Sequence, residues 1–260
     1  MIKTIYNRIY ADYLMPSRLK EYENIIVKSL EKNYIHITLS DYYIKLKNGQ
    51  LEDKRYFIHR HDIDTDLRTT RKMFEIEKKY NVKTTSYFRL STIDISLMRE
   101  MNDYGSEASY HFEEIATYCK RHKIKSKEQA LSKLDEMTKE FVSNFKSLET
   151  KLGYKLKTVA SHGDFVNRKL ALINNEITNN KVLRKEIDLD CESYDKDLKN
   201  SFGAYISDKP YPIYYSPENI FDIIGKHQVI CMLTHPRQWE TNFWVNTKDN
   251  IIRFIEGVKY

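Results

Sequence analysis

Short apolar runs alternate along the chain with longer segments in which apolar residues recur every three or four positions. The runs are rich in aromatic and β-branched residues and end at polar clusters, as strands do. The predicted strands cover 35–37, 56–58, 83–88, 107–111, 157–160, 203–206 and 228–233. Because strands alternate with helices throughout, the pattern predicts an α/β protein with a parallel sheet, open or closed.

The segments between the strands show helical periodicity. Leu19, Tyr22, Ile26 and Leu30 form one apolar stripe in the first 50 residues, which read as a helical lead-in. Further helices are predicted over 66–80, from Asp94 or Ser96 to about 102, over 113–122, from Ser126 to Gly153, and over 218–225. Ser126 and Gln129 resemble a capping box at the start of the longest helix.

Two further segments, residues 165–200 and the C-terminal residues, are also predicted to contain helices. Residues 165–200 are rich in Asn, Lys and Asp, and predict only a weak helix around 168–183. A final helix is expected with Asn246 as its cap and an apolar stripe facing the core. That stripe consists of Ile251, Ile252, Ile255 and Val258.

Length and composition fit one domain over residues 1–260. Hydrophobic residues make up 41% and charged residues 31% of the 260 positions, which suits one soluble core. About seven strands favour an imperfect barrel over a doubly wound sheet. The chain has no Gly-x-Gly-x-x-Gly and no Gly-x-x-x-x-Gly-Lys loop, which argues against nucleotide-phosphate folds.

The charge and the cysteines of the chain indicate its binding partners and its cellular location. The net charge of +6 is spread along the chain without a nucleic-acid motif, so we expect no nucleic-acid partner, whereas a phosphate-bearing small substrate is easier to accept. No run approaches the length of a membrane span, and the first residues do not read as a signal peptide. The three cysteines read as free thiols, which predicts a cytoplasmic protein.

The densest chemistry follows the strand at 56–58, where two imidazoles, a guanidinium and two carboxylates occur within His59–Asp64. Asp62 and Asp64 are two positions apart, so on an extended backbone they point to the same side. Two carboxylates with imidazole nearby indicate a metal ligand and a general base. A solvated, chemically idle loop is the alternative.

Three further predicted strands end at histidines, namely His111, His162 and His235. Any one of them could be a hydrogen-bonded structural histidine. Parallel strands, however, place their carboxyl ends on one face, so the repetition indicates one shared site.

The order of these clusters resembles the polysaccharide deacetylase family, the NodB-homology group of carbohydrate esterases. His61-Asp-Ile-Asp64 resembles the first motif in the His-Asp-Val-Asp form of a divergent branch, and Gly105–His111 resembles the second. Ser161-His-Gly163 stands in place of the third motif. Leu233-Thr-His-Pro236, followed by Trp239, resembles the last. The resemblance covers about residues 55 to 240.

This resemblance implies a distorted (β/α)7 barrel that hydrolyses N-acetyl or O-acetyl groups with one divalent ion, zinc being the first choice. It implies that Asp62 is the base and Asp64 a metal ligand, or the reverse, and that His111 is a second ligand. The second metal histidine of the family would fall at position 115, which is Ile here, and position 106 is Ser where the family often has His. We therefore expect His162 to be the third ligand, with Glu113 as a further candidate.

The remaining roles follow from the same hypothesis. His235 is expected to protonate the leaving group, and Asp208, at the end of the preceding strand, to orient it. Arg60 or His61 is expected to hold substrate or to balance the carboxylates, with a structural salt bridge as the alternative. Trp239 reads equally well as a pocket wall or as a core residue.

The resulting prediction is a metal-dependent hydrolase that removes an N-acyl group, or secondarily an O-acyl group, from a sugar or sugar-like precursor in surface polysaccharide biosynthesis. A catalytically inactive sugar-binding relative is one alternative, supported by Ile115. An HD-type metal phosphohydrolase, suggested by the bare His61-Asp62 pair, is another. We expect a small-molecule or glycan-precursor substrate.

Overall fold

Strands and helices alternate along the chain as the pattern predicts. A computed structural model describes residues 2–260, without the side chain of residue 2. The strands are β1 (Tyr34–His36), β2 (Arg55–Ile63), β3 (Thr85–Phe88), β4 (Glu107–Phe112), β5 (Thr158–Ser161), β6 (Cys191–Glu192), β7 (Ala204–Asp208), β8 (Tyr215–Ser216) and β9 (Val229–Thr234).

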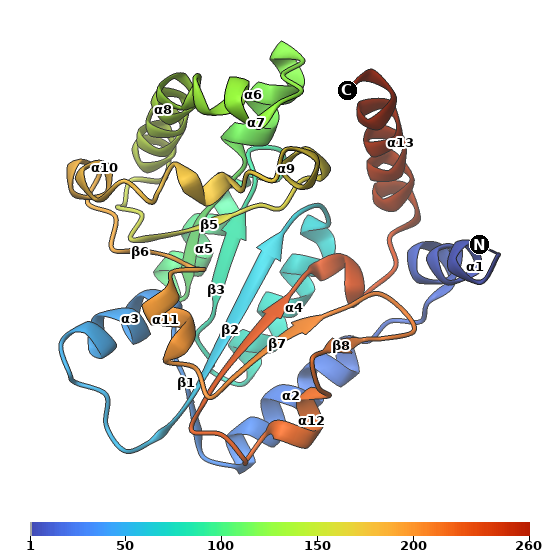
Figure 1. Ribbon diagram of the computed structural model, residues 1–260. Helices are drawn as coiled ribbons and strands as arrows, with labels where there is room; N and C mark the ends of the chain where they lie inside the picture. Colours follow the sequence, from blue (N-terminus) through green and yellow to red (C-terminus); the bar gives the residue numbers. More distant parts are fainter. Residues whose placement is uncertain (1) are drawn as a thin grey trace.

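Helices connect these strands (Figure 1). They are α1 (Ile2–Ile9), α2 (Leu19–Glu31), α3 (Leu39–Lys47), α4 (Leu67–Lys79), α5 (Ile95–Asp103), α6 (Glu114–His122), α7 (Lys127–Leu131), α8 (Leu134–Leu152), α9 (Phe165–Leu170), α10 (Lys181–Glu186), α11 (Lys196–Asn200), α12 (Ile220–Ile223) and α13 (Phe243–Lys259). Short π and 3₁₀ turns cover Tyr10–Leu14, Asn174–Glu176 and Pro236–Gln238.

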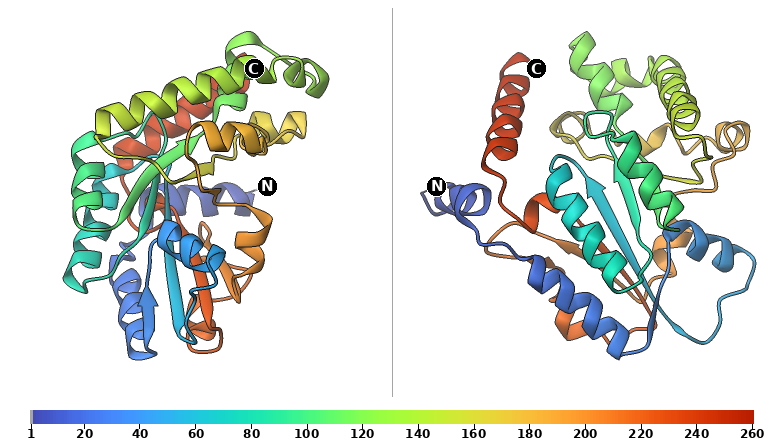
Figure 2. Two further views of the ribbon diagram at one scale, coloured as in Figure 1. Left: turned by 90° about the vertical axis from the view of Figure 1, so that its left-hand side faces the viewer. Right: turned by 180° about the vertical axis from the view of Figure 1, so that it is seen from behind.

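The strands form one nine-stranded sheet in the order β6-β5-β4-β3-β2-β9-β7-β8, and β1 pairs with the first half of β2. All pairs are parallel except β7 with β8. The sheet curls, and α2, α4 and α5 cover its outer face (Figure 2). The α/β class and the parallel sheet are thus confirmed.

Closure of the sheet into a seven-stranded barrel is not confirmed. Within residues 2–260 the strands at the two ends of the sheet, β6 and β8, do not pair with each other. Both are two residues long, and β8 runs antiparallel to its neighbour, so neither offers a parallel edge long enough to close the ring. The architecture is an open, curled half-barrel. A nine-stranded sheet also excludes the HD-type alternative, which requires an all-helical fold with the His-Asp pair on a helix.

Most of the predicted helices form, and most residues of their apolar stripes are buried, although Leu30 near the end of α2 is exposed. Met137, Phe141, Phe145 and Leu148 of α8 all lie in the largest hydrophobic cluster of the protein, as their spacing predicts. Ser126, however, caps the separate short helix α7, by accepting a hydrogen bond from the backbone N–H of Gln129. The predicted helix around 168–183 was wrong, because α9 ends where Ala171 takes a left-handed conformation (φ 48°).

The last helix is turned the opposite way from the prediction. Its cap is Asn242, while Asn246 is buried and donates a hydrogen bond to the carbonyl of Asp12 at 2.7 Å. The four residues expected in the core, Ile251, Ile252, Ile255 and Val258, are all exposed. The polar face packs inward because it carries the partners of Asp12 and Arg237, which include Asn250 and Asp249. Among residues 2–260, no helix is long and apolar enough to cross a membrane.

A chain of imidazoles lies between the outer face of β1 and β2 and helix α2. His36 contacts Ser29 Oγ through Nε2 (2.9 Å) and His59 Nε2 through Nδ1 (3.1 Å). Burial lowers the pKa of His36 to about 4, although Glu77 on α4 opposes this shift. Burial also lowers the pKa of His59 well below its usual value, and His36 and His61 add to that effect. Both rings therefore fold in the neutral form.

We expect acid to destabilise the fold through this cluster. Between about pH 6.5 and 4, the unfolded chain binds protons that folded His36 cannot, so the free energy of unfolding falls as the pH is lowered. The loss from His36 alone approaches about 3 kcal/mol at pH 4. Urea unfolding at several pH values should show a shallower decline for His36→Gln than for wild type, whereas His122→Gln, at an exposed position, should behave as wild type. Equal pH dependence of all three proteins would contradict the assignment.

Candidate functional site

Strand β2 presents its side chains alternately to the two faces of the sheet. Arg60 and Asp62 share one face, where Nε and Nη2 of Arg60 donate to the two carboxylate oxygens of Asp62 at 2.9 and 2.8 Å. Asp64 follows directly after the strand, and its backbone N–H donates to the carbonyl of Asp62 (3.0 Å). The two carboxylates thereby reach the carboxyl end of the sheet side by side.

Three predicted ligands converge at this end. Asp64 Oδ1 lies 3.4 Å from His111 Nε2 and 3.1 Å from His162 Nδ1, and the two imidazole nitrogens are 3.3 Å apart. These residues come from the ends of β2, β4 and β5. The sequence placed them on one face, and the structure brings them into one cluster that could hold a metal ion.

The sheet fixes the orientation of the two imidazoles. His111 is paired with Ala160 in the β4–β5 register, and its Nδ1–H donates to the Ala160 carbonyl at 2.9 Å. This hydrogen bond occupies Nδ1, so Nε2 is the nitrogen that faces Asp64 and that can bind a metal ion once it is deprotonated. The backbone N–H of His162 donates to the carbonyl of Phe112 (2.8 Å), which holds the loop after β5 against β4.

The spacing of the three atoms fits a divalent ion. In a tetrahedral zinc site, bonds of 2.0–2.2 Å keep neighbouring ligand atoms about 3.3 Å apart or slightly more. The separations of 3.1, 3.3 and 3.4 Å in the triangle of Asp64, His111 and His162 approach that value. Asp64 Oδ1 is buried and has no hydrogen-bond donor among the described residues, which fits an atom that ligates a cation.

The electrostatics of the cluster favour its charged forms. Burial raises the pKa of Asp64, but His162 and His111 outweigh it and hold the pKa well below its usual value. Burial also raises the pKa of Asp62, but the nearby charge of Arg60 outweighs burial. The pKa of Asp62 is therefore lowered as well. Both carboxylates are therefore ionised at neutral pH.

A second pair stands beside the triad. His235 Nδ1 lies 2.7 Å from Asp208 Oδ1, and the backbone N–H of His235 donates to Asp208 Oδ2 at 2.6 Å. Trp239 Nε1 donates to the same oxygen at 3.0 Å. Burial lowers the pKa of His235, but Asp208, Asp64 and Asp62 outweigh it and raise the pKa to about 9. The structure thus brings His235 and Asp208 together as the sequence predicts.

The three residues expected to bind substrate lie elsewhere or are already occupied, and this expectation is corrected. His61 is on the opposite face of β2, buried between Thr234 (2.5 Å) and Glu77 (3.1 Å). Arg60 is fully buried and bound to Asp62, which is the salt-bridge alternative. Trp239 is fully buried, as its core reading required, and supports Asp208.

Ile115 stands where the resemblance predicts a second metal-binding histidine. Its side chain is fully buried in the core and offers no ligand atom. A second group of possible ligands, Glu113, His162 and Asp164, shares His162 with the triad. Both carboxylates in it are committed, Glu113 to Arg89 (2.8 Å) and Asp164 to Lys120 (3.1 Å). The sequence offered no signal for the Arg89 and Lys120 partners, because they come from separate loops and helices.

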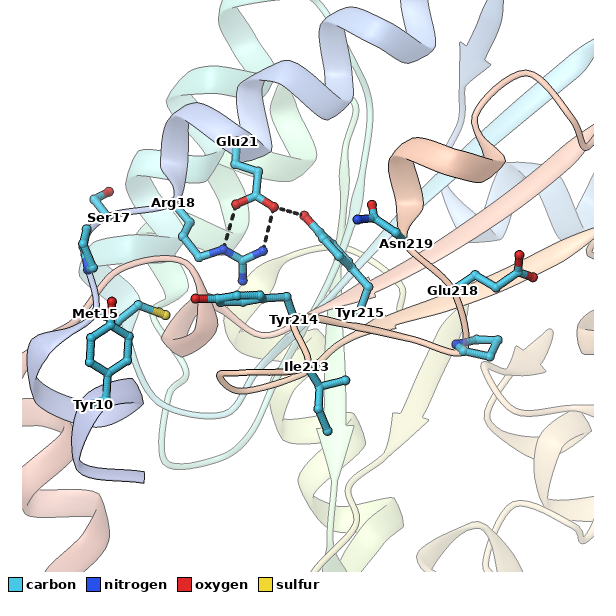
Figure 3. A pocket seen from close by; sticks show the side chains of 12 residues that line it. Tyr10, Met15, Ser17, Arg18, Glu21, Ile213, Tyr214, Tyr215, Glu218 and Asn219 are labelled. Atoms are coloured by element: carbon cyan, nitrogen blue, oxygen red, sulfur yellow. Dashed lines mark hydrogen bonds and ion pairs between the residues drawn. The ribbon is translucent and has the colours of Figure 1, made fainter. Parts of the chain in front are cut away.

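A cavity of about 1180 Å³ opens beside the triad, with Asp64 and His162 in its wall and α13 along one side. A smaller cavity of about 460 Å³ lies between α2 and the loop before β8 (Figure 3). There, Arg18 is held by Glu21 at 2.8 Å, and Tyr215 also donates to Glu21. In the smaller cavity Arg18, Glu21 and Tyr215 satisfy one another, and no triad residue lines it. We therefore expect substrate to bind in the larger cavity.

No family model and no curated protein matches the chain. Among solved structures, it is similar to a deacetylase of Streptococcus pyogenes, PplD, in complex with acetate, with 16% identity over 59% of this chain and 68% of that one and a TM-score of 0.42. It is also similar to the Xyl-CE4 domain of a multidomain xylanase from the hindgut metagenome of Trinervitermes trinervoides, with 14% identity, 80% and 84% coverage and a TM-score of 0.39. At these values the likeness establishes neither family nor activity.

Proposed function

We propose that the chain is a metal-dependent hydrolase that removes an N-acyl group, or secondarily an O-acyl group, from a sugar or sugar-like precursor of a surface polysaccharide. The triangle of Asp64, His111 and His162, with one Asp and two His at near-tetrahedral spacing, is the observation that carries this proposal. When bound there, a divalent ion such as zinc supplies a Lewis acid and a water of lowered pKa.

Asp62 is the base in this proposal. Its Oδ2 lies 3.4 Å from His111 Nε2, beside the triad, and Arg60 keeps it ionised, so it can take the proton from the attacking water. Among residues 2–260, Asp64 forms no ion pair with a Lys or Arg side chain, and it is directed at both imidazoles, which supports its role as the ligand of the pair.

His235 is the acid. Asp208 holds Nδ1, which leaves Nε2 as the nitrogen that can donate a proton, and a pKa of about 9 keeps the ring protonated at neutral pH. As the bond between the acyl carbon and nitrogen breaks, His235 protonates that nitrogen, because an unprotonated amide nitrogen is a poor leaving group. Water supplies the hydroxyl that remains on the acyl carbon.

The cellular location and the kind of substrate are part of the same proposal. Cys119, Cys191 and Cys231 are all buried free thiols, which supports a cytoplasmic protein acting on a small molecule or glycan precursor rather than on nucleic acid. The inactive sugar-binding alternative is supported by Ile115 and by the full engagement of both Asp62 oxygens with Arg60.

Metal titration separates these two readings. We expect chelator-treated protein to take up one equivalent of Zn²⁺ and to regain hydrolysis of N-acetylated amino sugars at the same stoichiometry, since the two possible ligand groups share His162 and cannot both be filled. Calorimetry would give the stoichiometry, and release of acetate the activity. Zinc uptake without acetate release from any acylated sugar would favour the binding protein, and no uptake at all would exclude the metal site.

A further inference from the structure

The large cavity beside the triad carries an uncompensated positive charge. Nine Lys and Arg side chains line it, against five Asp and Glu side chains. Every one of these carboxylates is within ion-pair distance of a cation or an imidazole. Four of the cations form no ion pair with any residue in 2–260, and they are Lys123, Arg168, Lys248 and Lys259.

These four side chains come from three separate parts of the fold. Lys123 follows α6, Arg168 lies on α9, and Lys248 and Lys259 lie on α13. All four are exposed, so each can reach a ligand without breaking an existing contact. A cleft lined by an excess of one charge concentrates ligands of the opposite charge.

The walls that carry these cations are tied to each other. Lys120 of α6 bridges Asp164, the cap of α9, at 3.1 Å and Glu256 of α13 at 3.0 Å. In the first half of α13, Asp249 pairs with Arg237. Because the polar face of α13 turns inward, Lys248 lines the cavity, and of the apolar residues expected in the core Ile252 lines it too while Ile251, Ile255 and Val258 do not.

We propose that this cavity binds the phosphate or diphosphate group of a phosphorylated saccharide, with Arg168 and Lys248 among its ligands, while the acyl group lies at the triad. This proposal rests on the proposed hydrolase function and names its substrate class. A phosphate group suits the site because it carries more than one negative charge and accepts hydrogen bonds from several Lys and Arg side chains at once. At about 1180 Å³, the cavity has room for a sugar and a diphosphate together.

Calorimetry with inorganic diphosphate tests the site directly. Chelator-treated protein is used, so that a bound metal cannot recruit the anion. We expect saturable binding by wild type and an affinity at least roughly tenfold weaker for the double variant Arg168→Gln, Lys248→Gln. The control is Lys146→Gln, Lys226→Gln, which removes two exposed cations outside the cavity that also form no ion pair with a described residue. It should bind as wild type does.

Absence of saturable binding to wild type would overturn the proposal, as would equal weakening by the two double variants. Uridine diphosphate and farnesyl diphosphate then distinguish a nucleotide carrier from a lipid carrier, and tighter binding of either one than of diphosphate supports the proposal. Weaker binding of both would overturn it, because a larger phosphorylated molecule would not fit.

The hydrolase proposal can fail independently. Asp64→Asn keeps all four cations and removes one negative charge from the cavity wall, so it should bind diphosphate at least as tightly as wild type does. Diphosphate binding without zinc uptake or hydrolysis would support the anion site and contradict the hydrolase proposal. Hydrolysis of a neutral acylated sugar without diphosphate binding would support the hydrolase proposal and contradict the anion site.

Discussion

Asp64→Asn should abolish zinc binding and lower hydrolysis by at least roughly a thousandfold, since several kcal/mol of transition-state stabilisation would leave with the ion. The change replaces one charged oxygen by an amide and keeps the shape of the side chain. Asp64 is the corner of the triangle that faces both His111 and His162, and it is the only carboxylate in the triad. Zinc content and acetate release measure the two effects.

Glu113→Gln is the matched control within the same cavity. Glu113 belongs to the second possible ligand group, but Arg89 already binds both of its carboxylate oxygens. We expect this variant to retain zinc and most of its activity. If Glu113→Gln loses the metal and Asp64→Asn keeps it, the ion lies among Glu113, His162 and Asp164, and the assignment to the triad is wrong.

Much of this site could be predicted from the sequence because parallel strands carry a strong geometric constraint. Once the runs ending at Asp64, His111 and His162 are recognised as strands of one sheet, their ends must share a face. The positions of the strands need only local information, namely apolar β-branched and aromatic runs followed by polar residues. This is why residues 98 positions apart in the chain (64 and 162) could be assigned to one cluster.

The error at His61 came from ignoring the same geometry. A strand alternates its faces, so the argument that put Asp62 and Asp64 on one side also put His61 on the other. There it pairs with Glu77, a residue of α4 that has no pattern connecting it to the site. The placement of His61 was thus predictable, whereas its partner was not.

The orientation of α13 could not have been read from the sequence. Helical periodicity identifies an apolar stripe, and burial of that stripe is the ordinary outcome. Here the polar face makes the specific contacts, because Asn246 and Asn250 meet Asp12 from a distant part of the chain. Only the tertiary partners decide which face turns inward, and the charge of the large cavity beside the triad depends on that choice.

His235→Gln should retain one equivalent of zinc but hydrolyse amides roughly 10² to 10⁴ times more slowly, which is the usual contribution of a positioned acid. No nitrogen of His235 belongs to either possible ligand group, so its loss should leave the metal in place. The effect should be smaller on an ester substrate, because an alkoxide leaves more readily than an amide anion. Loss of zinc in this variant would show instead that His235 is a ligand.

Asp208→Asn tests how His235 is held and charged. Asp208 contributes the largest of the carboxylate effects that raise the pKa of His235 to about 9, so its neutralisation should lower that pKa. In wild type, activity should decline as the pH rises through about 9, where the acid loses its proton. The variant should begin this decline at lower pH, with zinc content unchanged. Asn can still accept the hydrogen bond from Trp239 Nε1, so a merely structural role for Asp208 would leave the pH profile where it is, and an unmoved alkaline limb would refute the assignment of His235 as the acid.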